Sequence, residues 1–422
     1  MNLTEPTAYQ TPSRKGFVTN YPEFRHWKKL ALTELVTPRP LVLYVHIPFC
    51  AQRCAYCYYL TIQESRKSEI ERYVNALCRE IELAAAQFQL HGRPVMSLYF
   101  GGGTPTLLNE SQFTRMMECL HKHFTLANPE FTVEAEPVTL TEKKAALLQK
   151  LAVNRISLGI QSLCDDILKS ANRQDTEPKA LKAIKLAKAT GAVVNIDLLS
   201  GLAGETPATW AYTLEKAIAA DVHSITVYKM ELYANSDYYK EVRHQTIALP
   251  TDDQELDFMR FALAQFEQAN YLPWSFFTFT QAGRYPHLYA SSIWRGVDCY
   301  AFGVSAFGEL GHWLYQNTNE LEKYFAALDA GELPINRGYE LRSLDRIIRT
   351  VLLGMKLVRL DLQEFQQQFG FRLEALCAEA LAYLTAEAFV TVTEQALALT
   401  PKGILYGEYV GKILANDLKK SY

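Results

Sequence analysis

The sequence lacks the features of a membrane protein, a secreted protein or a charge-driven nucleic-acid binder. No apolar run approaches the ~18–20 residues that span a bilayer. Residues 1–16 are polar and contain no apolar stretch typical of a signal peptide. The formal net charge of −3 provides no general basic surface. We therefore expect a cytoplasmic protein that has no membrane span and does not bind nucleic acid through bulk charge.

The sequence also lacks a disulfide framework, internal repeats and low-complexity segments. Five of its 8 cysteines are scattered without regular spacing: Cys78, Cys119, Cys164, Cys299 and Cys377. A reducing cytoplasm disfavours disulfides, so these five are interpreted as small core residues. An apolar content of 49% is ordinary for a globular protein. The length of 422 residues favours one large domain and a smaller one.

The other three cysteines, Cys50, Cys54 and Cys57, are clustered with the spacing C-x3-C-x2-C. They follow LVLYVHIPF, an apolar run typical of a buried strand. Three thiolates from one strand end can bind a soft metal. Iron–sulfur cubanes normally have four cysteine ligands, so three leave one iron open. Zinc, which would need a fourth protein ligand, and unliganded thiols stay open as alternatives. The favoured interpretation is a [4Fe–4S] cluster.

Strand and helix patterns alternate through the first half of the chain. Apolar runs predict strands at 41–48, 96–101, 131–136, 155–160, 193–199 and 224–230. Helical patterns lie at 67–90, 109–124, 140–152, 164–170, 176–190 and 206–219. Six β-then-α units predict a parallel sheet covered by helices, in the α/β class. Right-handed crossovers would curl it into a partial (β/α)6 barrel whose open side suits a large substrate.

Glycine and polar residues gather where these strands end, the edge at which such sheets bind ligands. Besides the cysteines they are Gly101, Gly102, Gly103, Thr104, Glu134, Glu136, Gln161 and Arg173. A glycine run lets backbone amides approach a ligand closely, although it can also form a plain turn. The carboxylate of Glu134 could accept hydrogen bonds from ribose hydroxyls or an ammonium group. Asp197 lies inside a strand, where structural pairing is the alternative to a ligand role.

Outside the barrel core (41–235), three further parts are expected. Residues 1–40 form an aromatic-rich arm with a helical segment up to about Leu35. Residues 236–340 form an extension, with a strand across 299–311, that completes the active-site cleft.

Residues 341–422 read as a winged-helix-like α+β domain. Helices are expected at 342–358, in LDLQEFQQQFG and at 373–386, followed by a two-stranded wing and a final helix. The helix in the recognition position has one Arg and three Glu, so we expect a packing or lid module rather than a DNA-binding one.

Taken together, these motifs resemble the oxygen-independent coproporphyrinogen III oxidase family of radical S-adenosylmethionine (SAM) proteins. The motifs that carry the resemblance are LYVHIPFC, GGGTPT, ISLGIQS, ANRQD, NIDLLSGL, FGVSAFG and LTPKG. The resemblance runs from about Gly16 to the C-terminus. The family also includes haem chaperones, haem-opening enzymes and class C methyltransferases. The resemblance implies a [4Fe–4S] cluster on the three clustered cysteines, with SAM on the open iron. In the family, reductive cleavage of SAM yields a 5′-deoxyadenosyl radical that abstracts hydrogen from the substrate.

The resemblance also implies residues that contact SAM, carried over by position. Those implied for the first SAM are Tyr44, Gly102, Glu134 and, through its backbone, Phe307. Those implied for a second SAM are Tyr56, Gln161, Arg173 and Asp197. The backbone of Gly103 and Thr104 would also lie against SAM.

Two departures from the family pattern favour one branch. Tyr59 stands where the oxidases have a fourth cysteine, and YASSIW (289–294) keeps only the Trp of the chaperones' haem motif. We therefore expect an enzyme that uses one SAM as radical source and a second as methyl or methylene donor. Its substrate would be a large, partly hydrophobic small molecule, and its electron donor a flavodoxin or ferredoxin. A tetrapyrrole oxidase or haem-opening enzyme, and a haem-binding chaperone, stay as alternatives.

Overall fold

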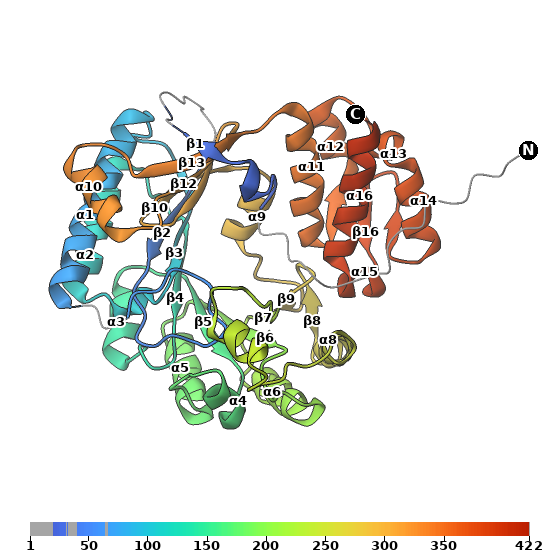
Figure 1. Cartoon of the computed structure of the whole chain (residues 1–422), viewed down its shortest axis with the longest axis horizontal. Coiled ribbons are helices and arrows are strands. Elements are labelled where there is room, and N and C mark those ends of the chain that lie inside the picture. Colours follow the sequence, from blue (N-terminus) through green and yellow to red (C-terminus); the bar gives the residue numbers. More distant parts are fainter. Residues whose placement is uncertain (1–19, 31, 33–39, 64–65, 422) are drawn as a thin grey trace, which may run out of the picture. The chain divides into compact units, whose positions relative to one another are not determined.

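The computed structural model describes residues 20–30, 32, 40–63 and 66–421, which divide into two compact units (Figure 1). The larger unit holds residues 25–272 and 278–341. The smaller unit holds 273–277, 342–422 and the chain up to Phe24.

The larger unit is built on a 13-stranded sheet with six parallel strands at its centre. These strands are β2 (Leu41–Ile47), β3 (Val95–Gly102), β4 (Glu130–Ala135), β5 (Arg155–Gln161), β6 (Val193–Ser200) and β7 (Ser224–Lys229). The helices between them are α1 (Lys67–Gln87), α2 (Glu110–His123), α3 (Glu142–Lys150), α4 (Asp165–Ser170), α5 (Glu177–Ala189) and α6 (Pro207–Ala219). Figure 1 shows these helices outside the strands. The predicted partial (β/α)6 barrel is confirmed, and the largest difference in bounds is the first helix, which ends at Gln87 instead of residue 90.

Local sequence explains where several of these helices begin. The Asn109 side chain accepts a hydrogen bond from the Gln112 N–H (2.9 Å), and the Gln112 side chain accepts one from the Asn109 N–H (2.9 Å). Thr206 and Thr251 form the same reciprocal cap ahead of α6 and α8 (Asp252–Gln268). Such caps satisfy N–H groups that the first helical turn leaves unpaired.

The sheet continues on both sides of the parallel strands, which the sequence did not predict. Next to β2 lie β10 (Asp298–Phe302), β11 (Phe307–Leu310), β12 (Trp313–Asn317), β13 (Ile335–Glu340) and β1 (Lys28–Lys29). Beyond β7 lie β9 (Thr278–Gln281) and β8 (Tyr271–Pro273). The extension also forms α7 (Asp237–Arg243), α9 (Leu288–Trp294) and α10 (Leu321–Asp329). Segments from the arm and the extension therefore share one sheet with the barrel.

One sequence prediction is wrong in this region. The single strand expected across 299–311 is two antiparallel strands, β10 and β11, because the backbone turns at Gly303 (φ +104°) and Ser305 (φ +65°). The described part of the arm forms a short 3-10 helix, Phe24–His26, and β1, which pairs with β13. The helical segment expected up to about Leu35 falls on residues 31 and 33–35, which lie outside the described residues.

Glu80 of α1 is a fully buried carboxylate that connects this helix to the segment from β10 to α10. Its Oε2 accepts hydrogen bonds from the Gly303 N–H (2.8 Å) and the Tyr324 hydroxyl (2.6 Å). Its Oε1 accepts one from the Asn317 amide (2.7 Å). Burial raises the pKa of Glu80 to about 7, although these three hydrogen bonds oppose the rise.

Glu80 is expected to make the protein less stable as the pH rises from 5 to 8. Its folded pKa of about 7 lies above the ordinary 4.5, so the folded state holds a proton that the unfolded state releases. This contribution to the free energy of unfolding is fully present below pH 4.5 and is lost as the pH rises through 7. It is worth at most ~3 kcal/mol. Urea unfolding at pH 5 and pH 8 should show a smaller loss of stability with rising pH in Glu80→Gln than in the wild type. Equal losses in the two proteins would contradict this assignment.

The smaller unit has the predicted C-terminal α+β domain with a third strand in its wing. Its helices are α11 (Ser343–Gly354), α12 (Leu362–Phe369), α13 (Leu373–Leu376), α14 (Ala378–Ala386), α15 (Pro401–Leu405) and α16 (Gly407–Ser421). Its strands, in sheet order, are β14 (Arg359–Asp361), β16 (Ala396–Leu399) and β15 (Val390–Val392). The expected helix 373–386 is interrupted at Cys377, and the final helix at Tyr406. Buried Lys356 and Glu408 form an ion pair (2.6 Å) inside this unit.

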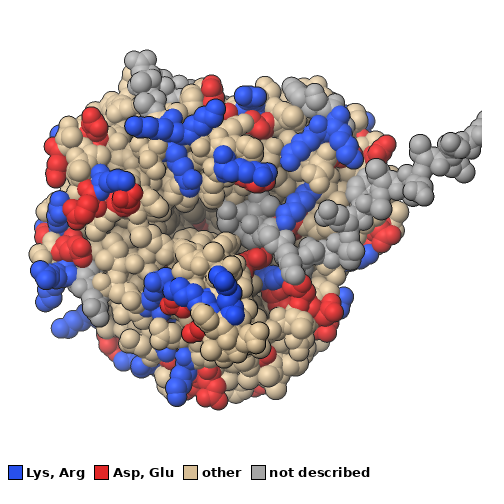
Figure 2. Space-filling view, viewed as in Figure 1, with Lys and Arg blue, Asp and Glu red and all other residues tan. Residues whose placement is uncertain are grey.

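The surface agrees with the charge balance of the sequence. On the face seen in Figure 2, Lys and Arg side chains are interspersed with Asp and Glu. In the described part of the chain, no helix combines the length and the apolar character that a membrane crossing requires. Of the five scattered cysteines, only Cys299 and Cys377 are buried, so the interpretation as core residues is wrong for the other three.

Candidate functional site

The cysteine loop follows β2 and is fixed by backbone hydrogen bonds. The Cys50 N–H donates to the Ile62 carbonyl (3.1 Å), and the Cys57 N–H donates to the Cys54 carbonyl (3.1 Å). All three thiols are free of disulfides. The Cys50 sulfur lies against the glycine run, because a Cβ on Gly103 would be 2.9 Å from it.

The three thiols lie in a largely desolvated loop, beside one carboxylate and one guanidinium. Burial raises the pKa of Cys50 to about 12 and of Cys57 to about 11, and it also raises the pKa of Cys54. The Glu136 carboxylate raises the pKa of all three thiols, whereas the Arg173 guanidinium lowers the pKa of Cys54. Three thiolates in such a loop therefore favour a cationic partner in addition to Arg173.

The donor set fits an iron–sulfur cluster better than zinc. Among the described residues, no three His, Cys, Asp or Glu side chains are arranged to hold a single metal ion. A zinc site requires such convergence on one point. A cubane distributes its cysteine sulfurs over different irons, so they need not converge. His46, whose Nδ1 lies 3.1 Å from the Tyr44 hydroxyl, follows β2's Val45 and precedes the first cysteine by four residues.

Arg173 is a buried hub between the cysteine loop and β5. Its Nη1 donates to the Cys54 sulfur (3.2 Å) and to the Tyr56 hydroxyl (3.1 Å). Its Nη2 donates to the Gly159 carbonyl (2.8 Å), and its Nε to Asp175 Oδ2 (2.9 Å). Arg173 therefore links a predicted cluster ligand to Tyr56, one of the residues predicted to contact a second SAM.

Gln52 of the cysteine loop forms hydrogen bonds with the loop that carries Arg173. The side-chain amide of Gln52 donates to Asp175 Oδ2 (3.2 Å), and its oxygen accepts from the Gln174 N–H (2.6 Å). The sequence did not single out Gln52 or Asp175, because partners 122 to 123 residues apart leave no local pattern.

The packing around the glycine run, Gly101 to Gly103, leaves no room for a side chain. A Cβ on Gly101 would lie 2.8 Å from the Glu134 carboxylate, and one on Gly102 would lie 2.4 Å from the His46 ring. Gly102 also has φ +107°, which side chains rarely adopt. The Gly102 N–H donates to Glu134 (2.9 Å), and the Gly103 N–H donates to the Ile47 carbonyl (2.7 Å). The backbone N–H groups of Gly102 and Gly103 are therefore bonded within the protein, and protein atoms occupy the Cβ side of all three glycines.

Two half-buried carboxylates, Glu134 on β4 and Asp197 on β6, lie among polar side chains of the sheet. Glu134 accepts a second hydrogen bond from the Tyr99 hydroxyl (2.6 Å). Asp197 accepts from Ser157 (2.8 Å) and Asn195 (3.0 Å), so the structural pairing considered for it is present. Burial raises the pKa of both acids, that of Asp197 to about 7, and Glu134 raises the pKa of Asp197 further.

Gln161 ends β5 in a strained conformation. Its φ is +65°, and the register between β5 and β6 shifts between Gly159 and Gln161. The shift turns the Gln161 side chain back over Gly159, where a Cβ would be 3.0 Å from its amide nitrogen. Bulges of this kind often redirect a side chain next to an active site.

Tyr44 belongs to a group of three aromatic rings with Tyr99 and Tyr289. Its ring centroid lies 5.9 Å from that of Tyr99 and 6.1 Å from that of Tyr289 on α9. Tyr99 and Tyr289 are 4.5 Å apart. Two predicted SAM residues remain. The Thr104 N–H donates to the Phe49 carbonyl (2.7 Å), and Phe307 starts β11 and packs its ring edge-to-face on Trp27 (6.1 Å).

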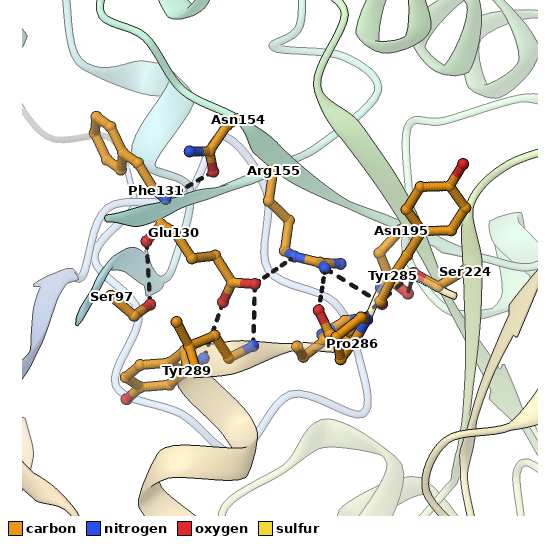
Figure 3. A network of polar contacts seen from close by, with 12 residues as sticks. Ser97, Glu130, Phe131, Asn154, Arg155, Asn195, Ser224, Tyr285, Pro286 and Tyr289 are labelled. Carbon is orange, nitrogen blue, oxygen red and sulfur yellow. Dashed lines mark hydrogen bonds and ion pairs between the residues drawn. The ribbon is translucent and has the colours of Figure 1, made fainter. Parts of the chain in front are cut away.

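The polar network in Figure 3 holds the start of helix α9 against β4 and β5. Glu130 accepts hydrogen bonds from the backbone N–H groups of Leu288 (3.0 Å) and Tyr289 (2.9 Å) and from Arg155 Nε (3.1 Å). Arg155 also donates to the Pro286 carbonyl (2.5 Å). This network places Tyr289, which the sequence analysis did not select for the site, beside Tyr44.

Comparisons with known proteins agree with this architecture. The Radical SAM superfamily model matches residues 44–217, and the HemN C-terminal domain model matches residues 341–406. The oxygen-independent coproporphyrinogen III oxidase of Escherichia coli K12 is 30% identical over 389 residues, covering 87% of this chain and 83% of the oxidase. The heme chaperone HemW of Bacillus subtilis is 26% identical over 376 residues, covering 87% of this chain and 97% of the chaperone.

A solved structure extends the similarity to the fold. Coproporphyrinogen III oxidase (HemN) from Escherichia coli aligns with a TM-score of 0.79 and 28% identity, covering 90% of this chain and 91% of that one. The chain belongs to the radical SAM superfamily and, within it, to the oxygen-independent coproporphyrinogen III oxidase-like family. This membership confirms the predicted cofactors, a [4Fe–4S] cluster and SAM.

Proposed function

We propose that this protein is a radical SAM enzyme that uses one SAM as radical source and a second as methyl or methylene donor to an organic substrate. The main support is the group of Cys50, Cys54 and Cys57 beside Arg173, whose guanidinium contacts both Cys54 (3.2 Å) and Tyr56 (3.1 Å). When bound there, the cluster supplies the electron that cleaves SAM to a 5′-deoxyadenosyl radical. SAM itself carries a sulfonium and an ammonium, which suit the neighbouring carboxylates.

In this proposal the chain binds and orients two SAM molecules at the same sheet edge. For the first SAM we assign Tyr44, Gly102, Glu134 and the backbone of Phe307. For the second we assign Tyr56, Gln161, Arg173 and Asp197, and Gly103 and Thr104 contribute backbone contacts. The contacts among Arg173, Tyr56 and Gly159 support one shared subsite beside Gln161.

The methyl-donor branch is favoured over oxidative decarboxylation by Tyr59. A tyrosine occupies the position of the oxidases' fourth cysteine, and 54% of its surface is exposed. The proposal includes a large, partly hydrophobic substrate and a flavodoxin or ferredoxin as electron donor. It also includes the functional division into an arm (1–40), a barrel core (41–235), an extension (236–340) and a C-terminal domain (341–422).

Deuterated SAM tests this proposal before the substrate is known. Protein reconstituted without oxygen is incubated with dithionite and SAM that carries a trideuterated methyl group. We expect 5′-deoxyadenosine that contains deuterium, because the hydrogen would come from the methyl group of the second SAM. Product without deuterium would reject the methyl-donor role and leave the radical SAM assignment standing. No 5′-deoxyadenosine at all, from protein with a full cluster, would reject both.

A tetrapyrrole oxidase is the second candidate, favoured by the similarity over 90% of the chain to the coproporphyrinogen III oxidase of Escherichia coli. Release of carbon dioxide from coproporphyrinogen III under the same conditions would support it. The chaperone candidate depends on haem binding near His287, whose Nε2 lies 3.3 Å from the Ser224 hydroxyl. A Soret band that forms on haem titration and is lost in His287→Ala would support that candidate.

A further inference from the structure

Three tyrosine rings form a stack beside the cysteine loop. The ring centroid of Tyr58 lies 3.9 Å from that of Tyr233, at an interplanar angle of 31°, and 4.2 Å from that of Tyr59, at 28°. The Tyr58 hydroxyl donates to the Tyr59 hydroxyl (2.9 Å). The Asn235 amide donates to the Tyr58 carbonyl (2.7 Å). Tyr58 is therefore covered on both faces and held in place at its backbone.

Tyr59 ends this stack and leaves much of its ring uncovered. It is 54% exposed, more than any other large apolar or aromatic side chain exposed in the described residues. Its position is set by the chain, because Tyr59 follows the predicted cluster ligand Cys57 by two residues and its hydroxyl accepts the hydrogen bond from Tyr58 (2.9 Å). An open aromatic face at the end of a ring stack is a binding surface for a flat partner.

This open face adjoins the site proposed for radical chemistry. Tyr59 belongs to the same loop as Cys57, whose N–H donates to the Cys54 carbonyl (3.1 Å). A group stacked on Tyr59 would therefore lie close to the cluster that the three cysteines are proposed to hold.

We propose that Tyr59 is a specificity-determining residue whose open face stacks on a planar, conjugated ring of the substrate. The inference rests on the proposed function only in calling the bound ring a substrate. The near-parallel arrangement of the existing rings favours a fourth flat ring over an aliphatic chain, because offset stacking of aromatic faces is favourable beyond the area buried. Loss of one such stacking contact weakens binding by about 3- to 10-fold.

This inference separates the chain from a porphyrinogen-specific enzyme. The four pyrroles of a porphyrinogen are joined by saturated bridges, so they do not form one conjugated plane. A preference for planar rings would therefore distinguish this protein from the relatives that are named oxidases.

Two matched pairs of probes test the inference with the reconstituted holoenzyme. The planar probes are quinoline and coproporphyrin III, and their non-planar counterparts are decahydroquinoline and coproporphyrinogen III. Dissociation constants are measured by anaerobic equilibrium dialysis for the wild type, Tyr59→Phe and Tyr59→Leu. Tyr212→Leu is the matched control, because Tyr212 is a surface tyrosine on α6 with 39% exposure and its hydroxyl donates to Glu177. Retention of the cluster's iron content verifies that each variant is folded at the site.

We expect at least one planar probe to bind more tightly than its non-planar counterpart. Tyr59→Leu should weaken that probe about 3- to 10-fold, while Tyr59→Phe and Tyr212→Leu stay within about twofold of the wild type. Failure of both planar probes to bind, or equal binding by Tyr59→Leu, would overturn the inference. Wild-type protein that binds planar probes through Tyr59 but forms no 5′-deoxyadenosine would reject only the proposed function. Wild-type protein that cleaves SAM but shows no planar preference would reject only the inference.

Discussion

Cys54→Ala is expected to lose the iron–sulfur cluster and all reductive cleavage of SAM. Cys54 is buried, and its sulfur already accepts a hydrogen bond from the Arg173 guanidinium (3.2 Å). With only two thiolates left, the cluster would lack a ligand that water cannot replace in a largely desolvated loop. Iron and sulfide content after anaerobic reconstitution, together with 5′-deoxyadenosine formation, measures the effect. Cys50→Ala and Cys57→Ala should behave in the same way.

Cys164→Ser is the matched control for these variants. Cys164 lies just before α4, is only partly buried and makes no side-chain cap of that helix. We expect a full cluster and wild-type SAM cleavage in this variant. A full [4Fe–4S] cluster in any of the three alanine variants would contradict the ligand assignment.

Arg173→Met is expected to destabilise the folded protein by ~3–5 kcal/mol, because it leaves the Asp175 charge buried without its partner. The side chains of the pair are 2% and 0% exposed and lie 2.7 Å apart. The variant also loses the hydrogen bonds to Cys54, Tyr56 and Gly159, so the cysteine loop should incorporate less cluster. Urea unfolding of the apo protein and iron content after reconstitution measure the two effects separately.

The double variant Arg173→Met/Asp175→Leu distinguishes a buried ion pair from a loss of packing. Removing both partners avoids an unpaired buried charge, so part of the lost stability should return while cluster incorporation stays low. Lys150→Met, which removes a surface pair with Glu110 (2.7 Å), should leave stability unchanged. An Arg173→Met variant as stable as Lys150→Met would show that the hub makes no contribution to folding.

The barrel and the cluster ligands could be predicted because their signals are local. Each of the six central strands is a short apolar run bounded by turn residues, and the three cysteines lie within eight positions of one another. The carboxyl ends of parallel strands meet at one edge, which brought Glu134, Gln161 and Asp197 into the predicted site. Their partners could not be predicted. The hydrogen bond from Asn195 to Asp197 and the left-handed backbone of Gln161 have no signature in residue type or spacing.

By itself, the sequence determined the class of chemistry: three thiolates after a buried strand, in an α/β barrel of the radical SAM type. Only the tertiary structure decided how these residues are supported and which surface lies beside them. β10 aligns with β2, and Asn235 holds Tyr58 across 177 residues of chain. Arg173 reaches Cys54 across 119 residues. The physical reason is that burial and hydrogen bonding between distant segments depend on how the whole chain packs, whereas ligand spacing within one loop is written in consecutive residues.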